Sequence, residues 1–325
     1  MKTWIDFDNA PVFTVPIIEE CAGPRSFGGM LVEGPQGWGE FSPPVGAAEV
    51  IDGRWLMAAI EVGTVGWPDP VRGRIPVAAT VPAVTPDRAH QLATESGCGS
   101  IVVEVASPQQ TLADDLTRVE AVRGALGPAA AIRCDAHGRW DPKTAIAAIA
   151  ALDRAAGGIE FIEQPCASLA EIAAVRSSVA VPIAVEQSLW NLPAHAVGQV
   201  RAAADILVLN VAALGGVRRS LRVAESIGLP SAVTAGIQSS IGIAGGVALA
   251  GVLPDSRYAS ELATVRLLGA DVVSPARTLI PVAGQLPVAP MPAAPDPALL
   301  RRFSPTDPDT ISRWRRRLSA AQRYL

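Results

Sequence analysis

Several features that would assign the chain to other classes of protein are scarce or absent from its sequence. Lysine occurs only twice among the 325 residues, as Lys2 and Lys143. The four cysteines do not follow the spacing of a zinc site, which is typical of reduced thiols in a chain of this size. No apolar run reaches the roughly 18 to 20 residues that cross a bilayer. The opening residues MKTWIDFDNA lack the basic segment of a signal peptide.

The formal net charge of −4 argues against non-specific binding to nucleic acid. We therefore expect a cytoplasmic protein that binds a small molecule and has neither nucleic acid nor a membrane as a partner. The sequence leaves its oligomeric state open.

What the sequence does contain is a regular alternation of strand-like and helix-like segments from about residue 75 onward. The strand-like segments are short, apolar and rich in β-branched residues, and stretches such as TLADDLTRVEAVRGAL separate them at the spacing of one βα unit. Seven or eight such units in series favour an α/β fold with a closed TIM-type barrel over an open sheet. The predicted strands are residues 75–81, 101–106, 131–136, 159–164, 182–187, 206–211 and 231–236.

Residues 1–72 follow a different pattern, with hairpin-like alternation in GGMLVEGPQGWGEFSPP and then a helical stretch. We expect an α+β capping domain there, packed over a barrel domain of residues 73–289. The apolar stretch 241–254 is dotted with glycine and is predicted to be a buried helix. The tail, residues 290–325, is predicted to pack back on the cap and to end in a basic surface helix.

Acidic side chains stand where several predicted strands end. Glu104 interrupts the apolar strand SIVVEVA, on the same face as Val102, and a carboxylate sealed there without a partner would cost several kcal/mol. Asp135, Glu163 and Glu186 end the next three strands. The carboxyl ends of parallel barrel strands converge on one cavity. Three carboxylates on adjacent strands suit a hard divalent ion, so the sequence predicts a site for Mg²⁺ or Mn²⁺.

Four motifs carry a family resemblance, namely RCDAHGRWD (133–141), FIEQPC (161–166), VPIAVEQS (181–188) and VLNVAALGGVRRSL (208–221). In order and spacing the chain resembles the enolase superfamily, and within it the o-succinylbenzoate synthases of actinobacterial type. The resemblance implies a modified (β/α)₇β barrel with an N-terminal capping domain and an active site between the two. It also implies that Asp135, Glu163 and Glu186 are the Mg²⁺ ligands, although the third ligand is more often Asp followed by Glu.

The same resemblance implies three lysines that this chain does not have. The family dehydratase uses a Lys-x-Lys on the second barrel strand and a further lysine on the sixth, which abstract the proton next to the substrate carboxylate and stabilise the enolate. This chain has Val102, Glu104 and Asn210 at those positions. We therefore interpret Glu104 as a candidate acid or base and Asn210 as a candidate hydrogen-bond donor to a substrate oxygen.

Further positions differ from the family pattern. His137 replaces an asparagine, Gln238 replaces an acid, and EECAG (19–23) replaces a basic capping loop. His137 could share the acid–base role, or could be only a polar residue after the strand. Thr234, Gln238 and Ser239 could line the substrate end of the site.

The charge balance leads to two expectations. With four acids and no lysine, either a divalent ion is bound strongly, or one carboxyl, with Glu104 the first candidate, is protonated near neutral pH.

Three functional readings follow from these substitutions. The chain is a repurposed lyase, dehydratase, isomerase or cyclase of specialised metabolism, a non-catalytic binding or scaffold protein that keeps the fold but has lost the chemistry, or a working o-succinylbenzoate synthase. Polar replacements such as Glu104 and Asn210 favour the first reading, whereas Val102 and Ala78 favour the second.

Overall fold

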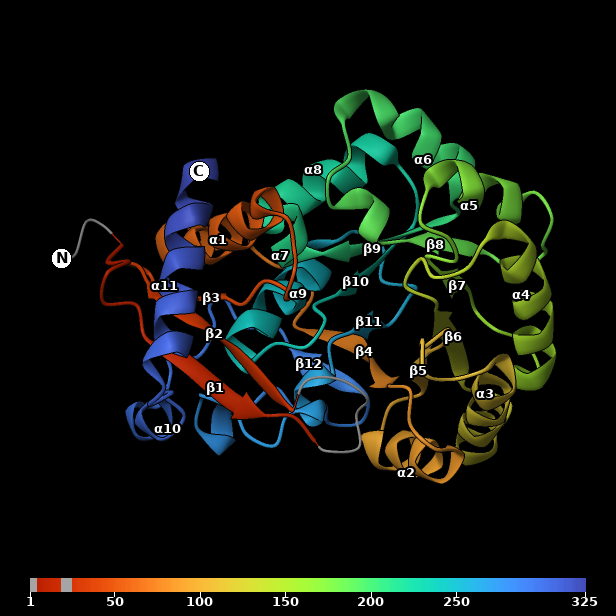
Figure 1. Cartoon of the computed structure of the whole chain (residues 1–325), viewed down its shortest axis with the longest axis horizontal. Coiled ribbons are helices and arrows are strands. Elements are labelled where there is room, and N and C mark those ends of the chain that lie inside the picture. The colour runs from red at the N-terminus through yellow and green to blue at the C-terminus, as the bar shows by residue number, and fades with distance from the viewer. Residues whose placement is uncertain (1–4, 19–24) are drawn as a thin grey trace.

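The computed structural model describes residues 5–18 and 25–325, which form a small antiparallel sheet beside a closed parallel barrel. Helix α1 (Glu49–Thr64) packs on the sheet, and a Cβ at Gly39 would overlap the backbone of Ala59 in that helix, so the glycine permits the close approach. The sheet and α1, called the cap below, lie to one side of the barrel in Figure 1. The sheet order is β1 (Val12–Pro16), β2 (Ser26–Glu33), β3 (Trp38–Phe41).

Eight parallel strands close the barrel, because β11 pairs with both β10 and β4. The α/β fold class predicted from the sequence, a TIM-type barrel with an N-terminal α+β cap, is confirmed. Seven strands fall within or next to the predicted ranges, and the sequence analysis missed the eighth. The strands are β4 (Arg74–Val81), β5 (Ser100–Glu104), β6 (Ala131–Asp135), β7 (Ile162–Glu163), β8 (Ile183–Val185), β9 (Ile206–Asn210), β10 (Ser231–Thr234) and β11 (Ser260–Glu261).

Helices connect the strands and cover the outside of the barrel (Figure 1). Local signals set their ends: Thr111 and Asp114 form a capping box at the start of α3, and Gly157 ends α4 in the left-handed conformation. The helices are α2 (Pro86–Ser96), α3 (Leu112–Leu126), α4 (Pro142–Ala156), α5 (Leu169–Arg176), α6 (Val197–Ala203), α7 (Val211–Leu214), α8 (Val217–Ile227) and α9 (Ser240–Val252).

The apolar stretch predicted as a buried helix is α9, in which nearly every side chain is buried. Gly246 faces the side chain of Leu262, which follows β11, and leaves no room there for a Cβ. Within the described ranges, no helix combines the length and the apolar character needed to cross a membrane.

The tail returns to both parts of the molecule. Strand β12 (Gln285–Pro287) pairs antiparallel with β4, α10 (Pro297–Arg302) follows, and α11 (Pro308–Ala321) crosses α1 (Figure 1). Trp314 packs edge-on against Phe41 of the cap sheet, and Arg317 binds Asp52 of α1 through two hydrogen bonds of 2.6 and 2.7 Å. The basic helix therefore buries one face on the cap. The domain boundaries at residues 72 and 289 stay predictions. Single-turn helices complete the chain at Gln187–Leu189, Ala194–Ala196, Thr264–Leu267, Pro275–Arg277 and Gln322–Tyr324.

A buried carboxyl, that of Glu40 on β3, joins the cap to the barrel. It accepts a hydrogen bond of 2.6 Å from the hydroxyl of Ser42, and it also accepts from the hydroxyl and the backbone N–H of Ser239, the residue that caps α9. Burial raises the pKa of Glu40 to about 7, against the serine hydrogen bonds and with a contribution from Asp271. The junction is therefore more stable when Glu40 carries a proton.

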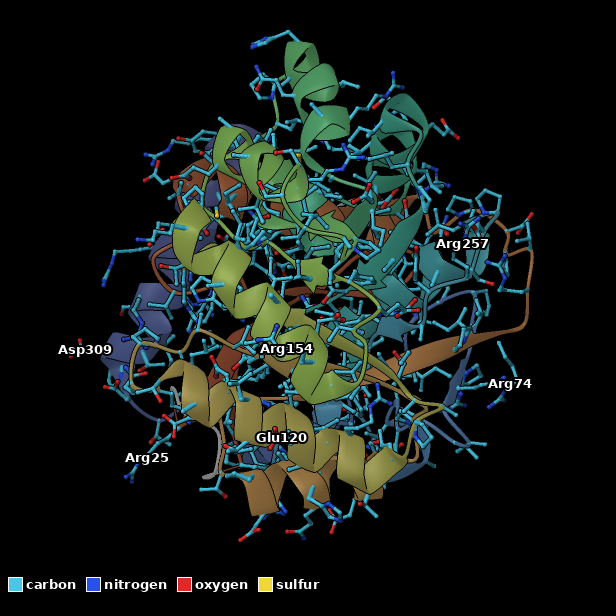
Figure 2. All side chains as sticks on the ribbon, turned by 90° about the vertical axis from the view of Figure 1, so that its right-hand side faces the viewer. Arg25, Arg74, Glu120, Arg154, Arg257 and Asp309 are labelled. Carbon is cyan, nitrogen blue, oxygen red and sulfur yellow. The ribbon has the colours of Figure 1, made fainter. Side chains whose placement is uncertain are left out.

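We predict that Glu40→Gln changes the pH dependence of stability. An unfolded glutamate loses its proton near its ordinary pKa of 4.5, whereas folded Glu40 keeps it up to about pH 7. The wild type therefore loses stability between these values, by on the order of 3 kcal/mol, and the glutamine variant does not. Urea unfolding at pH 4.5, 6 and 8 measures the difference. Glu120→Gln, on the exposed face of α3 (Figure 2), is the matched control. Parallel pH profiles for wild type and Glu40→Gln would contradict the prediction.

Candidate active site

The strand register brings the predicted acids to the same end of the barrel. Glu104 pairs with Asp135 across β5 and β6, and Asp135 pairs with Glu163 across β6 and β7. Glu163 pairs with Ala184 on β8, so Glu186 follows two residues further along that strand's direction. These carboxylates therefore lie around one strand-end site, as the sequence analysis expected.

His137 lies between the first two of these acids. Its Nε2 is 3.2 Å from Oε1 of Glu104, and its Nδ1 is 3.0 Å from Oδ2 of Asp135. Its backbone N–H donates to Oδ1 of Asp135 at 2.8 Å, and the residue adopts φ of 51° in the loop after β6. Burial lowers the pKa of His137, but the two carboxylates outweigh it and raise that pKa to about 9. His137 therefore carries a positive charge at neutral pH.

The expectation that Glu104 is the protonated carboxyl is wrong. Burial raises the pKa of Glu104, but the hydrogen bond and the charge of His137, together with Arg139, hold it below its ordinary value. Glu104 is ionised at neutral pH. The side chains of His137 and Glu104 are 26% and 33% exposed, so a molecule in solution can reach this ion pair.

The carboxyl pKa values at the ends of β7 and β8 are instead raised. Burial, Asp135, Glu261 and Glu186 raise the pKa of Glu163 well above its ordinary value. Burial and Asp135 raise the pKa of Glu186 to about 8, although two hydrogen bonds oppose this. The indole N–H of Trp190 donates to Glu186 at 2.8 Å, and the amide of Asn210 donates to the same oxygen at 3.2 Å.

Asn210 also has a local structural role. It is the last residue of β9. Its Oδ1 accepts a hydrogen bond of 3.2 Å from the backbone N–H of Ala213, and through this bond Asn210 caps the start of α7. Its side chain thus links the start of that helix to Glu186. Its role as a donor to substrate stays a prediction.

The sequence analysis missed Glu261, a further acid at the same end of the barrel. It closes the ring on β11 and accepts hydrogen bonds from the hydroxyls of Thr80, at 2.6 Å, and Thr234, at 2.9 Å. Burial raises its pKa, and the threonine hydrogen bonds oppose this. One signal could have found it: a further βα unit after residues 231–236 places an eighth strand end close to this position.

The three residues predicted to line the substrate end make contacts within the protein. Thr234 donates to Glu261, the hydroxyl of Ser239 donates to Glu40 of the cap, and Gln238 is 3% exposed. Their contact with a substrate stays a prediction. Lys2 and the segment EECAG (19–23) lie outside the described residues.

Two arginines support the strands without facing solvent. Arg118 on α3 donates to the backbone carbonyl of Glu104 at 3.1 Å and forms an ion pair with Asp115, which fixes the end of β5. Arg133, inside the barrel, donates to Glu160 and to the carbonyl of Ala259, each at 2.6 Å. A cation inside the barrel was not predicted from the sequence. Arg133 forms its hydrogen bonds with these partners, and its charge also opposes the rise in the pKa of Glu163.

The side chains of Asp135, Glu163 and Glu186 fit Mg²⁺ or Mn²⁺ by donor type. Glu163 is buried among other carboxyls, and no described residue donates a hydrogen bond to its carboxylate, so a cation there would lower the free energy. In the described part of the chain, however, no three His, Cys, Asp or Glu side chains are gathered as a ligand group. Asp135 contacts His137, and Glu186 contacts Trp190 and Asn210, so both must shift to bind a metal.

Comparisons with known proteins agree with the fold. The model described as enolase C-terminal domain-like matches residues 85–290, and the one described as enolase N-terminal domain-like matches residues 12–63. The chain therefore belongs to the enolase superfamily, as the sequence motifs predicted.

Its relatives include enzymes named o-succinylbenzoate synthase. The one from Thermobifida fusca is 46% identical over 276 residues, which cover 85% of this chain and 86% of the relative. The one from Mycolicibacterium smegmatis is 43% identical over 286 residues, covering 86% and 84%.

Solved structures of the superfamily share the fold. The L-Ala-D/L-Glu epimerase from Bacillus subtilis has a TM-score of 0.75 at 20% identity, covering 91% of this chain and 98% of that one. Muconate lactonizing enzyme from Pseudomonas fluorescens has a TM-score of 0.76 at 20% identity, covering 93% and 98%. At this identity the likeness concerns the fold alone.

We predict that Mg²⁺ binding releases protons. Because the pKa values of Glu163 and Glu186 are raised, the ion must displace protons from them, and its affinity rises with pH by up to about tenfold per pH unit for each proton displaced, until the pH exceeds those pKa values. Calorimetry in two buffers of different ionisation enthalpy measures the released protons. Glu163→Gln abolishes binding, whereas Glu120→Gln leaves it unchanged. An affinity for Mg²⁺ that does not depend on pH would contradict this assignment.

Proposed function

We propose that the chain is an enolase-superfamily enzyme that uses Glu104 and His137, in place of lysines, to transfer protons on a small carbon acid. The reaction class is that of a lyase, dehydratase, isomerase or cyclase acting in the cytoplasm, in specialised metabolism. One observation carries this proposal: the contacts from Glu104 to His137 and on to Asp135, of 3.2 and 3.0 Å, lie at the strand ends where the family resemblance implies lysine.

The states of the two side chains suit opposite roles. Ionised Glu104 can accept a proton, and the His137 imidazolium can donate one to a leaving oxygen or a carbanion. Asp135 orients the imidazole through Nδ1, which leaves Nε2 on the side of Glu104. Both side chains are partly exposed, so a substrate can displace their mutual contact.

The proposal also assigns residues that would hold a metal ion and residues that would contact the substrate. Asp135, Glu163 and Glu186 would hold Mg²⁺ or Mn²⁺, which when bound would polarise a substrate carboxylate. The amide of Asn210 lies beside Glu186 and would orient a substrate oxygen. The buried, uncharged surface of Val102 would pack against the body of the substrate.

A working o-succinylbenzoate synthase is the second candidate, supported by relatives of that name at 40–46% identity. It requires that Glu104 and His137 supply the base and the positive charge that the family resemblance assigns to three lysines. The loss of positioned charge of this kind typically lowers turnover by orders of magnitude. We therefore rank this candidate below a different reaction.

We predict exchange of substrate protons with solvent. Purified protein with Mg²⁺ is incubated in D₂O with a panel of small carboxylic acids and with the cyclohexadiene precursor of the synthase reaction, and mass spectrometry measures deuterium and product. Glu104→Gln and His137→Asn each lower the exchange rate by about 10²- to 10⁴-fold, because each removes one proton-transfer group. Glu120→Gln does not change it.

The outcomes separate the candidates. Exchange without turnover of the cyclohexadiene supports the proposed enzyme, and fast, Glu104-dependent turnover of that compound establishes the synthase. Exchange that survives both substitutions rules out the Glu104–His137 pair. A non-catalytic binding protein is indicated by a different result. In that case no member of the panel exchanges protons, and a panel member that binds the wild type binds Glu104→Gln equally well.

A further inference from the structure

A pocket lies apart from the acids at the strand ends. It has a volume of about 450 Å³ and is bounded by the end of β1, the segment 265–280 after β11, and helix α10. None of the acids at the strand ends lines it. Its size lies within the range of small-molecule sites, roughly 300 to 1,000 Å³.

Arg266 lines this pocket, and one nitrogen of its guanidinium has no hydrogen-bond partner among the described residues. Its Nε is buried and has no hydrogen-bond partner, and no described carboxylate forms an ion pair with it. A buried charged donor without a partner costs free energy, which an anion in the pocket would recover. Arg302 of α10 also lines the pocket, and its guanidinium lies 5.3 Å from the centre of the Phe303 ring and forms no ion pair with a described carboxylate.

Among the described lining residues, the single acid does not neutralise these arginines. Asp271 is buried, and it accepts hydrogen bonds from the hydroxyl of Ser240 and, at 2.7 Å, from the backbone N–H of Val272. The described lining therefore has two arginines and one carboxylate, which is already hydrogen-bonded at the start of α9. The charge of these described residues is positive on balance.

The rest of the wall is largely apolar. Leu268, Val273 and Ile280 come from the segment after β11, and Leu299 and Phe303 come from α10 and its end. An inorganic anion would leave these side chains without a partner. A ligand with an apolar body and one anionic head matches both parts of the lining.

We propose that this pocket binds a small amphiphilic carboxylate. Its carboxylate contacts Arg266 and Arg302, and its apolar body packs against the side chains of Val273, Ile280 and Leu299. An arginine fork binds a carboxylate through two parallel hydrogen bonds, and Arg266 has that capacity free. The site is separate from the proposed catalytic pair, so it stands or falls independently of the proposed reaction.

The test uses the full chain and three probes of matched structure. Octanoate has both the apolar body and the anionic head, octanol lacks the charge, and acetate lacks the body. Calorimetry is expected to detect octanoate binding at least tenfold tighter than that of either other probe. Binding of octanol as tight as that of octanoate would overturn the proposal, because the arginines would then contribute nothing.

Substitutions then locate the site. Arg266→Met weakens octanoate binding at least tenfold, and Arg302→Met weakens it to a smaller extent. Arg154→Met on the surface of α4 (Figure 2) and Arg301→Met, next to Arg302, are the matched controls and leave it unchanged.

Ile280→Trp provides an independent check, because this partly exposed residue lines the pocket and a larger side chain fills it without removing charge. Ile280→Trp is expected to weaken octanoate binding, and this test remains available if Arg266→Met fails to fold. Octanoate affinity equal to wild type in both Ile280→Trp and Arg302→Met would place binding elsewhere and refute the proposal.

Discussion

The mutual repulsion of buried carboxyls at the barrel mouth is the constraint on which the rest of the site depends. Glu104, Asp135, Glu163, Glu186 and Glu261 end five strands of one ring, and no described lysine lies among them. At an intermediate dielectric, several ionised carboxylates a few ångströms apart repel one another by several kcal/mol. Each acid must therefore be compensated by a positive charge, a hydrogen bond, a proton or a metal ion.

The chain uses a different compensation on each side of the ring. On β5 and β6, the His137 imidazolium lies between the partly exposed carboxylate of Glu104, whose pKa it lowers, and the buried carboxyl of Asp135. On β7 and β8, Glu163 and Glu186 are buried and keep their protons to higher pH. On β11, hydroxyl donors hold Glu261. The mouth therefore has one charged, accessible side and one side whose buried carboxyls keep their protons to higher pH.

Much of this arrangement could be predicted from the sequence, because strand periodicity fixes both the order and the facing of side chains. Alternation placed Glu104 on the inner face of its strand, and successive βα units brought the acids to one end. The prediction failed where pattern carries little information: β11 has two residues, Ser260 and Glu261, and no apolar repeat. The contact of His137 depends on its left-handed backbone in a loop, which a single sequence does not specify.

The pairing of Glu104 with His137 bears on whether these substitutions are decay or adaptation. Where the family resemblance implies lysine and asparagine, this chain has an acid and a histidine 3.2 Å apart. Glu104 without His137 would add an unpaired acid to a crowded ring. His137 beside a lysine would place two cations together. Each substitution is therefore favourable only with the other, whereas loss of selection would more readily leave small apolar residues such as Val102. A matched charge pair in an accessible position is what an acid–base function requires, and it supports an active enzyme more strongly than the identity of any one residue.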